Sequence, residues 1–204
     1  VDASEPAGGL VARLASLPNL PPVEVHLKGD GPLDNFAARL DARAGGAADA
    51  VGDLSIIRDG ARRRASLDLA AHIAALLPRD AAALFEDQTK VKAVGWFGDD
   101  KAVALDAIEL STSAFRLTGD AKLAPDGGLA GQFAAVGATP RPNASFAAAR
   151  LEARAKISGS LTEPEGALRL LVEDASAPMG RIGHLDMDAS VARDVGAAAS
   201  GFTV

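Results

Sequence analysis

The sequence contains no cysteine, which excludes disulfide bonds, thiolate metal sites and cysteine nucleophiles. Aromatic residues make up only 4% of the 204 residues, so a core must be filled mainly by Leu, Val, Ile and Ala. No apolar run approaches the roughly 20 residues that a membrane-spanning helix needs, and no signal peptide opens the chain. Because the first residue is Val1, we expect a segment of a longer protein whose targeting information lies elsewhere.

Positive charge is scarce as well. The formal net charge is -6, and nucleic-acid binding calls for a basic face, so we predict no nucleic-acid partner. The only basic run is 62–64, three arginines that we interpret as a solvated end of a strand.

Local catalytic motifs are missing too: the sequence has no G-x-S-x-G, G-x-x-x-x-G-K or H-E-x-x-H. His26, His72 and His184 do not lie at metal-ligand spacing. Asp186 and Asp188 share one face of a strand, where they would hold a cation, act as paired carboxylates or simply be solvated, and we favour solvation. The sequence therefore predicts no catalytic residue, no metal and no cofactor.

What the sequence does contain is strict alternation, seen best over 151–161. Leu151, Ile157 and the residues between them at every second position are apolar or small, whereas their neighbours Glu152, Arg154 and Lys156 are charged. Successive side chains of a strand point to opposite faces, so this pattern predicts a strand with one dry face and one wet face.

The same alternation returns along most of the chain. It predicts strands over 23–29, 36–44, 54–56, 65–69, 91–97, 103–110, 115–123, 129–135, 151–161, 168–172 and 185–191. Asp59-Gly60 is a strong hairpin signal, and further turns are expected at 31–35, 98–100, 125–128 and 163–166. The apolar residues change from odd positions to even positions near Asp106-Ala107, which predicts a β-bulge there.

The predicted fold is mainly β: one long, curved antiparallel sheet that leaves an open groove, also called a β-taco. Short helices are expected near 8–17 and 70–87, where apolar residues recur at helical spacing. The whole of 1–204 is interpreted as a single β-rich segment, with a possible excursion at 137–146, where two prolines lie close together.

The apolar face has two interpretations. Two such sheets would close a sandwich core, or one curved sheet would keep its dry face as a groove. Abundant Ala and Gly with few aromatics favour the groove, since small residues leave room for a guest. The side chains predicted to line it are Leu117, Leu123, Leu151, Ile157, Leu168, Leu170, Leu185 and Met187.

Three stretches resemble the AsmA-like repeats of the TamB translocation and assembly module family: Leu14–Pro18 followed by Leu20–Asp34, the Ala-Ala-Leu-Leu run that ends at Pro78, and Leu117–Gly127. The resemblance implies a Gram-negative periplasmic bridge anchored in the inner membrane through parts absent from this chain. It also implies an apolar β groove that shields phospholipid acyl chains, and an Omp85-type outer-membrane protein as partner.

Two other functions compete with this lipid conduit. The segment would act as a scaffold or chaperone for outer-membrane proteins such as autotransporters if its sheet edge paired with their strands. It would be an enzyme if its loops assembled a site, for which a cluster of perturbed carboxylates in a deep polar pocket would be the sign. We predict that it is not an enzyme.

Overall fold

The computed structural model describes most of the chain. The described residues are 2–9, 12–13, 19–77, 82, 84–137, 147–177, 180–191 and 202–203.

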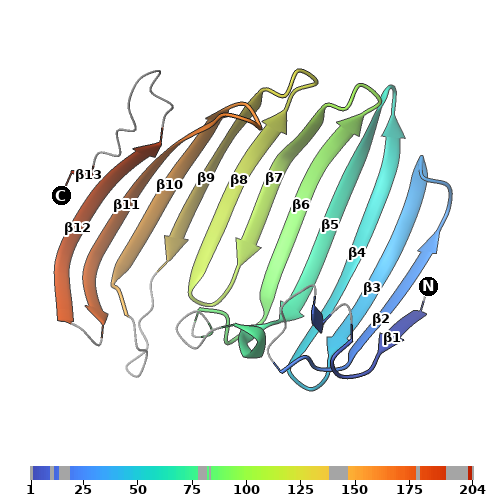
Figure 1. Cartoon of the computed structure of the whole chain (residues 1–204), viewed down its shortest axis with the longest axis horizontal. Helices are drawn as coiled ribbons and strands as arrows, with labels where there is room; N and C mark the ends of the chain where they lie inside the picture. Colours follow the sequence, from blue (N-terminus) through green and yellow to red (C-terminus); the bar gives the residue numbers. More distant parts are fainter. Residues whose placement is uncertain are drawn as a thin grey trace.

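One antiparallel sheet of thirteen strands accounts for nearly all of the described residues, and its strands are ordered as they occur in the sequence (Figure 1). The strands are β1 (Asp2–Glu5), β2 (Val23–Asp30), β3 (Asn35–Ala44), β4 (Ala48–Asp59), β5 (Arg62–His72), β6 (Thr89–Gly98), β7 (Val103–Ser111), β8 (Phe115–Leu123), β9 (Leu129–Gly137), β10 (Arg150–Gly159), β11 (Pro164–Ala177), β12 (Gly180–Val191) and β13 (Phe202–Thr203). The sheet is open, with β1 and β13 at its two edges. The prediction of a long antiparallel sheet is confirmed.

Tight turns connect the strands at one rim of the sheet, which we call the hairpin rim. In the β4–β5 turn Gly60 has a φ of 61°, a conformation that glycine adopts without strain. In the β8–β9 turn Asp126 Oδ1 accepts a hydrogen bond of 2.9 Å from the Gly128 amide. The β6–β7 turn is fixed in the same way, since Asp100 Oδ1 accepts from the Ala102 amide at 3.1 Å. These turns lie where the sequence predicts them.

The opposite rim, which we call the loop rim, carries three long connections besides the short connections that join β3 to β4, β7 to β8 and β11 to β12 (Figure 1). Residues 6–22 join β1 to β2, residues 73–88 join β5 to β6, and residues 138–149 join β9 to β10. At the loop rim a long connection therefore follows β1, β5 and β9, which is every fourth strand. Because an even number of antiparallel strands separates them, all three begin at the same rim.

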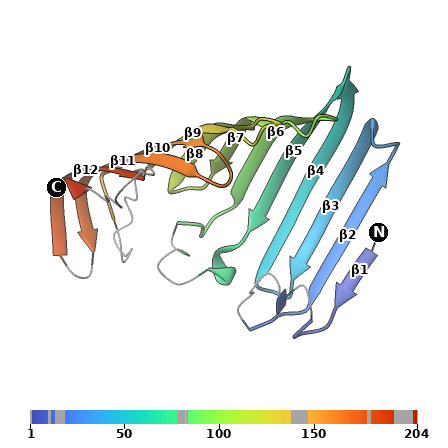
Figure 2. The ribbon, with the colours of Figure 1, turned by 45° about the horizontal axis from the view of Figure 1, so that its top comes forward.

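A β-bulge interrupts β7 at the predicted place. The register shifts between Leu105 and Ile108 in the pairing with β8, so Asp106 and Ala107 together span the distance of one residue on the partner strand. The shift returns Ile108 to the face that Leu105 occupies. Bulges increase the local twist, and Figure 2 shows β8–β12 turned nearly edge-on where β2–β5 are still seen broadside.

Some boundaries differ from the prediction. The helix expected from residue 70 begins later, because β5 continues to His72, and its described part includes a 3₁₀ turn at Ala74–Leu76. The turn expected at 163–166 is shifted, since β11 already begins at Pro164. Of the helix expected near 8–17, Ala12 and Arg13 are helical, and residues 10, 11 and 14–17 lie outside the described residues, as do 138–146 of the expected excursion. Among the described helical residues, none belongs to a helix long and apolar enough to cross a membrane.

Candidate functional site: the apolar face of the sheet

The strand register aligns the apolar side chains into continuous rows that cross the sheet. The middle row runs Leu27, Leu40, Gly52, Leu69, Val91, Leu110, Leu117, Ala135, Ala153, Leu170, Met187. The next row runs Gly29, Ala38, Leu54, Leu67, Ala93, Ile108, Gly119, Phe133, Ala155, Leu168, Ala189. The row nearer the hairpin rim runs Phe36, Ile56, Ala65, Gly95, Leu105, Ala121, Gly131, Ile157, Gly166, Val191. No polar side chain interrupts these rows, which define what we call the apolar face.

All eight side chains predicted to line a groove lie on this face. Leu170 and Met187 extend the middle row from Leu117, and Leu168 and Ile157 belong to the other two rows. Leu123 lies opposite Val103 and Leu129 at the hairpin rim. Leu151 and Leu185 both pair with Val172, nearer the loop rim. The sequence thus identified the C-terminal half of the face and omitted its continuation over β2–β7.

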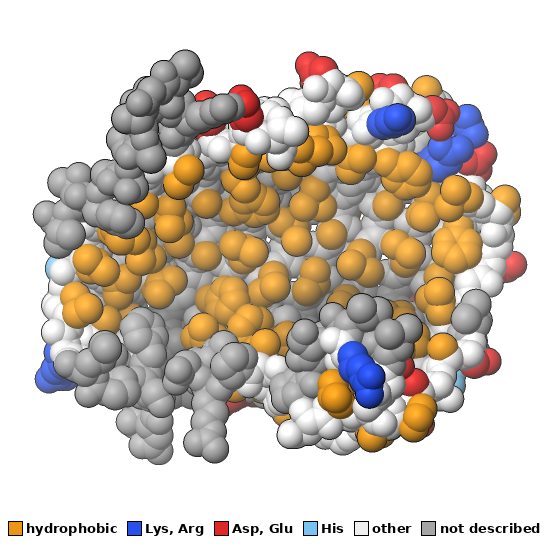
Figure 3. All heavy atoms as spheres, viewed as in Figure 1, with side chains coloured by type: hydrophobic (Ala, Val, Ile, Leu, Met, Phe, Trp, Pro, Cys, Tyr) orange, Lys and Arg blue, Asp and Glu red, His pale blue; other side chains and the backbone are white. Residues whose placement is uncertain are grey.

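No second layer covers the apolar face in the described part of the chain. Figure 3 shows hydrophobic side chains across the whole width of this face, with charged side chains confined to its rims. Leu168 and Val103 lie on the apolar face and are nevertheless 38% and 46% exposed, as expected for a face without a cover. The chain exposes 13242 Å², whereas a compact monomer of 20.6 kDa is expected to expose about 8,900 Å². The sandwich interpretation is therefore wrong for the described residues.

Among the residues that the structure describes, packing against the apolar face lies at the loop rim. Ala12, from the connection between β1 and β2, is buried against Val23 and Ala44. Ala148, just before β10, packs in the same way against Val172 and Ala175.

The connection between β5 and β6 makes an aromatic contact at the same rim. The ring of Phe85 meets that of Phe115 edge-on, with centroids 5.5 Å apart. The long connections thus narrow the apolar face along one side, and the tight turns leave the other side open.

The opposite face of the sheet is polar and carries ion pairs between neighbouring strands. Arg39 and Asp53 are 3.5 Å apart on neighbouring strands, and Lys92 and Asp68 are 3.4 Å apart. These four side chains border a hollow of about 640 Å³ on the polar face. Arg39 and Lys92 are each paired with a carboxylate of a neighbouring strand, so neither contributes an unpaired charge to the hollow.

The chemistry-bearing residues noted in the sequence are dispersed over the polar face. His26 pairs with Asp2 at 2.9 Å, and His72 pairs with Asp49 at 3.1 Å, on separate strands. His184 lies on β12, opposite Glu173.

The paired carboxylates of β12 are joined to an arginine. Arg169 Nη2 donates to Asp186 Oδ2 at 2.8 Å and faces Asp188 in the register. Both carboxylates raise the pKa of the Arg169 guanidinium, the hydrogen bond to Asp186 contributing most. In the part of the chain that the structure describes, no group of three potential ligands is placed to hold a metal ion.

The basic run 62–64 is split between the two faces. Arg62 stacks over the Trp96 ring on the polar face, with Cζ 3.9 Å from the ring centroid. Arg63 has the opposite parity and lies over Phe97, its cross-strand partner, at 5.9 Å. Arg63 therefore reaches the margin of the apolar face, and its side chain is only 18% exposed.

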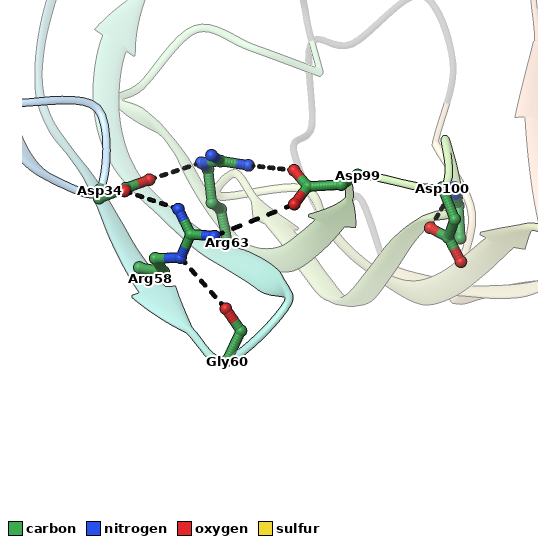
Figure 4. Close-up of polar contacts among 7 residues, drawn as sticks. Asp34, Arg58, Gly60, Arg63, Asp99 and Asp100 are labelled. Atoms are coloured by element: carbon green, nitrogen blue, oxygen red, sulfur yellow. Dashed lines mark hydrogen bonds and ion pairs between the residues drawn. The ribbon is translucent and has the colours of Figure 1, made fainter.

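Four charged side chains form a cluster at the hairpin rim, which we call the rim cluster: Asp34, Arg58, Arg63 and Asp99 (Figure 4). Asp34 accepts 2.8 Å hydrogen bonds from Arg58 Nη1 and from Arg63 Nε, one on each carboxylate oxygen. Asp99 Oδ1 accepts a hydrogen bond of 2.7 Å from Arg63 Nη1. The two guanidinium groups, Arg58 first, hold the pKa of Asp34 below its ordinary value. The cluster joins three successive hairpins.

Sequence analysis missed the rim cluster, although a signal was present. Arg58 follows Leu54 and Ile56 at the same parity, and Arg63 precedes Ala65 and Leu67 in the same way. In each strand of this hairpin, the arginine occupies the next position on the same face as the apolar residues. This pattern predicts positive charge at the margin of the apolar face.

Comparison of the chain with family models, with curated proteins and with solved structures finds no match in any of the three.

Proposed function

We propose that this chain shields the acyl chains of phospholipids on the apolar face of its sheet, as one segment of a bridge between two membranes. The observation that carries the proposal is the set of apolar rows that cross the sheet without an interruption and, among the described residues, without a covering layer. Monomeric proteins rarely leave so large a contiguous apolar surface without a partner.

The dimensions of the face suit an extended apolar guest. From β2 to β12 the rows cross ten inter-strand spacings, which amount to about 48 Å at roughly 4.8 Å per spacing. The many Ala and Gly side chains project little from the sheet and leave space above it for a guest. The long connections of the loop rim cover one side of this space. An acyl chain lying along the rows would meet side chains about as apolar as the lipid interior.

The energetics indicate that the apolar face would increase the rate of lipid transfer without setting its direction. Exposing one methylene group to water costs about 0.8 kcal/mol, so a tail of about 16 carbons faces a barrier near 12 kcal/mol. An apolar face removes most of that barrier because the tail leaves one apolar environment for another. Net transfer is then nearly neutral, and directionality requires a further component.

The resemblance to the TamB family supports a cellular setting for this activity. We propose that the segment acts in the periplasm of a Gram-negative cell, as part of a protein anchored in the inner membrane. Its partner at the far end is an Omp85-type outer-membrane protein. The resemblance, and not the fold alone, carries this part of the proposal.

Native mass spectrometry with lipid extraction tests the proposal. Phospholipid is expected to co-purify with the wild-type chain and to be lost when Ile157 or Leu170 is replaced by Asp. Ala167→Asp is the matched control, because it adds the same charge on the opposite face of β11, opposite Lys156. Circular dichroism verifies that each variant is folded.

Two results would contradict the proposal. A wild-type chain that stays monomeric, folded and free of lipid when mixed with phospholipid would show that the apolar face holds none. Equal lipid loss in Ala167→Asp and Leu170→Asp would show that charge, and not the face, controls retention.

A scaffold for outer-membrane strands is the second candidate, and the edge of the sheet favours it. In the described part of the chain β1 pairs with 23–26 of β2, and no described strand lies beside 28–30 on that side. Such an edge can accept a further strand. A photo-crosslinker at Lys28 that captures an unfolded outer-membrane strand, while one at Leu170 does not, would favour this function over lipid transfer.

A further inference from the structure

The rim cluster places opposite charges beside the apolar face. Arg58 and Arg63 face each other across β4 and β5, two residues nearer the hairpin rim than Ile56 and Ala65 of the apolar rows. Neighbouring side chains on one face of a strand are roughly 7 Å apart. A molecule with its tail on the rows would therefore reach both guanidinium groups with its polar end.

The guanidinium groups are arranged around a single oxyanion. The carboxylate of Asp34 bridges them by giving one oxygen to each arginine. The two non-bridging oxygens of a phosphodiester present the same arrangement of acceptors, and paired arginines are well suited to it.

Donors remain available for such an anion. Each arginine has five N–H groups. Arg58 uses one for Asp34 and one for the Gly60 carbonyl oxygen, and Arg63 uses one for Asp34 and one for Asp99. In the described part of the chain the remaining N–H groups have no assigned acceptor. The Arg58 side chain is 45% exposed and that of Arg63 is 18% exposed, so the cluster opens to solvent mainly through Arg58.

The carboxylates determine which headgroup fits. Two aspartates balance two arginines, so the cluster has no net charge and would not concentrate anions in general. Asp99 is the most exposed member, at 61%, and its second oxygen is 4.0 Å from Arg58 Nη2, beyond hydrogen-bonding distance. That oxygen can accept from an ammonium group while the guanidinium groups hold a phosphate.

We propose that the rim cluster binds the zwitterionic headgroup of a phospholipid, with the phosphate on Arg58 and Arg63 and the ammonium group on Asp34 and Asp99. The inference rests on the proposed function, because it requires the acyl chains to lie on the apolar face. It adds a chemical preference: a headgroup that carries both charges is retained more strongly than one that carries a phosphate alone or no charge.

A competition experiment on the wild-type chain tests this preference. The protein is mixed with equal amounts of three lipids that have the same acyl chains: phosphatidylethanolamine, phosphatidylglycerol and diacylglycerol. Native mass spectrometry then measures the retained ratio. Phosphatidylethanolamine is expected to exceed diacylglycerol roughly tenfold, the effect of one hydrogen bond to a charged group, and to exceed phosphatidylglycerol by a smaller factor.

Two double variants separate the contribution of the arginines to headgroup preference from that of the aspartates. Arg58→Gln with Arg63→Gln is expected to abolish the preference for either phospholipid over diacylglycerol. Asp34→Asn with Asp99→Asn is expected to keep that preference while losing the advantage of ethanolamine over glycerol. The matched control is Arg39→Gln with Arg43→Gln, which removes two arginines from the polar face of β3 and is expected to change no ratio.

The outcomes separate the two proposals. If the wild-type chain retains no lipid, the proposed function fails. If it retains all three lipids equally, only the headgroup proposal is overturned. Circular dichroism is recorded for every variant, and the wild-type ratios decide the proposal even where a variant unfolds.

Discussion

The ring of Phe133 occupies the space that a side chain on Gly119 would need. These residues face each other across β8 and β9 on the apolar side. A methyl group on Gly119 would overlap Phe133 Cδ1 and would lie 2.6 Å from the Gln132 carbonyl oxygen. The aromatic ring thus covers backbone that the glycine leaves bare, a pairing that stabilises glycine positions in sheets.

Gly119→Ala is expected to lower the free energy of unfolding by about 1–3 kcal/mol, the usual cost of overpacking. Gly183→Ala is the control, because β12 leaves that position open, with no atom within 4 Å of an added methyl. Urea unfolding measures both variants. In a Phe133→Leu background the Gly119→Ala cost should shrink, and an undiminished cost would show that the Gln132 carbonyl oxygen, and not the ring, is the obstacle.

Thr89→Val is expected to stabilise the chain by about 1–2 kcal/mol, because Thr89 carries a buried hydroxyl without a described hydrogen-bond partner. Thr89 is 3% exposed and faces Ala71 at the loop rim. Thr118→Val, on the exposed polar face of β8, serves as the control and should change stability little. A loss of stability in Thr89→Val would indicate that the hydroxyl has a partner in the folded chain.

Deleting Asp106 is expected to leave the sheet intact. Without that residue Val103, Leu105, Ile108 and Leu110 would alternate regularly and keep their present partners on β8. Deleting Thr118 should instead turn half of β8 over, because a one-residue slip exchanges the two faces. Urea unfolding is expected to stay cooperative in the first deletion and to lose cooperativity in the second. Equal damage in both would mean that the bulge itself is required.

Stability is expected to fall at acidic pH partly through Asp34. Its pKa is lowered in the folded state from an ordinary value of 3.8, the bonds from Arg58 and Arg63 being the main causes. A lowered folded-state pKa gives a stabilising contribution that is full above about pH 4 and is lost as the pH falls through the folded-state pKa. The difference in urea midpoint between wild type and Asp34→Asn should therefore be constant from pH 7 to 5 and shrink below 3.8. A difference that does not change with pH would contradict the role of the ionised carboxylate.

The strands and turns were largely predictable because their signals are local. Alternation at every second residue identified most strands, and the parity change between Leu105 and Ile108 located the bulge. The same alternation placed all eight predicted side chains on one face. Ala70 and Ala71 were predicted to be helical, since alanine favours helices in isolation. In the folded chain β4 and β6 pair with these residues on both sides, and tertiary context overrides the local preference.

The rim cluster was not predictable in the same way. Arg63 lies 29 residues from Asp34 and 36 residues from Asp99. These residues meet only because consecutive hairpins are adjacent at one rim, which requires the strand order to be known. The lack of a covering sheet also depends on the whole topology, because one alternating strand is compatible with a sandwich and with an open face.

The recurrence of a long connection after every fourth strand gives the sheet a natural unit of growth. Inserting or duplicating four strands would return the chain to the loop rim, keep both faces in phase and lengthen the apolar rows by about 19 Å. Duplicating an odd number of strands would reverse the strand direction and exchange the two rims for everything that follows. An architecture of this kind can be adapted to a different distance between its ends by whole units, without redesign of any single strand.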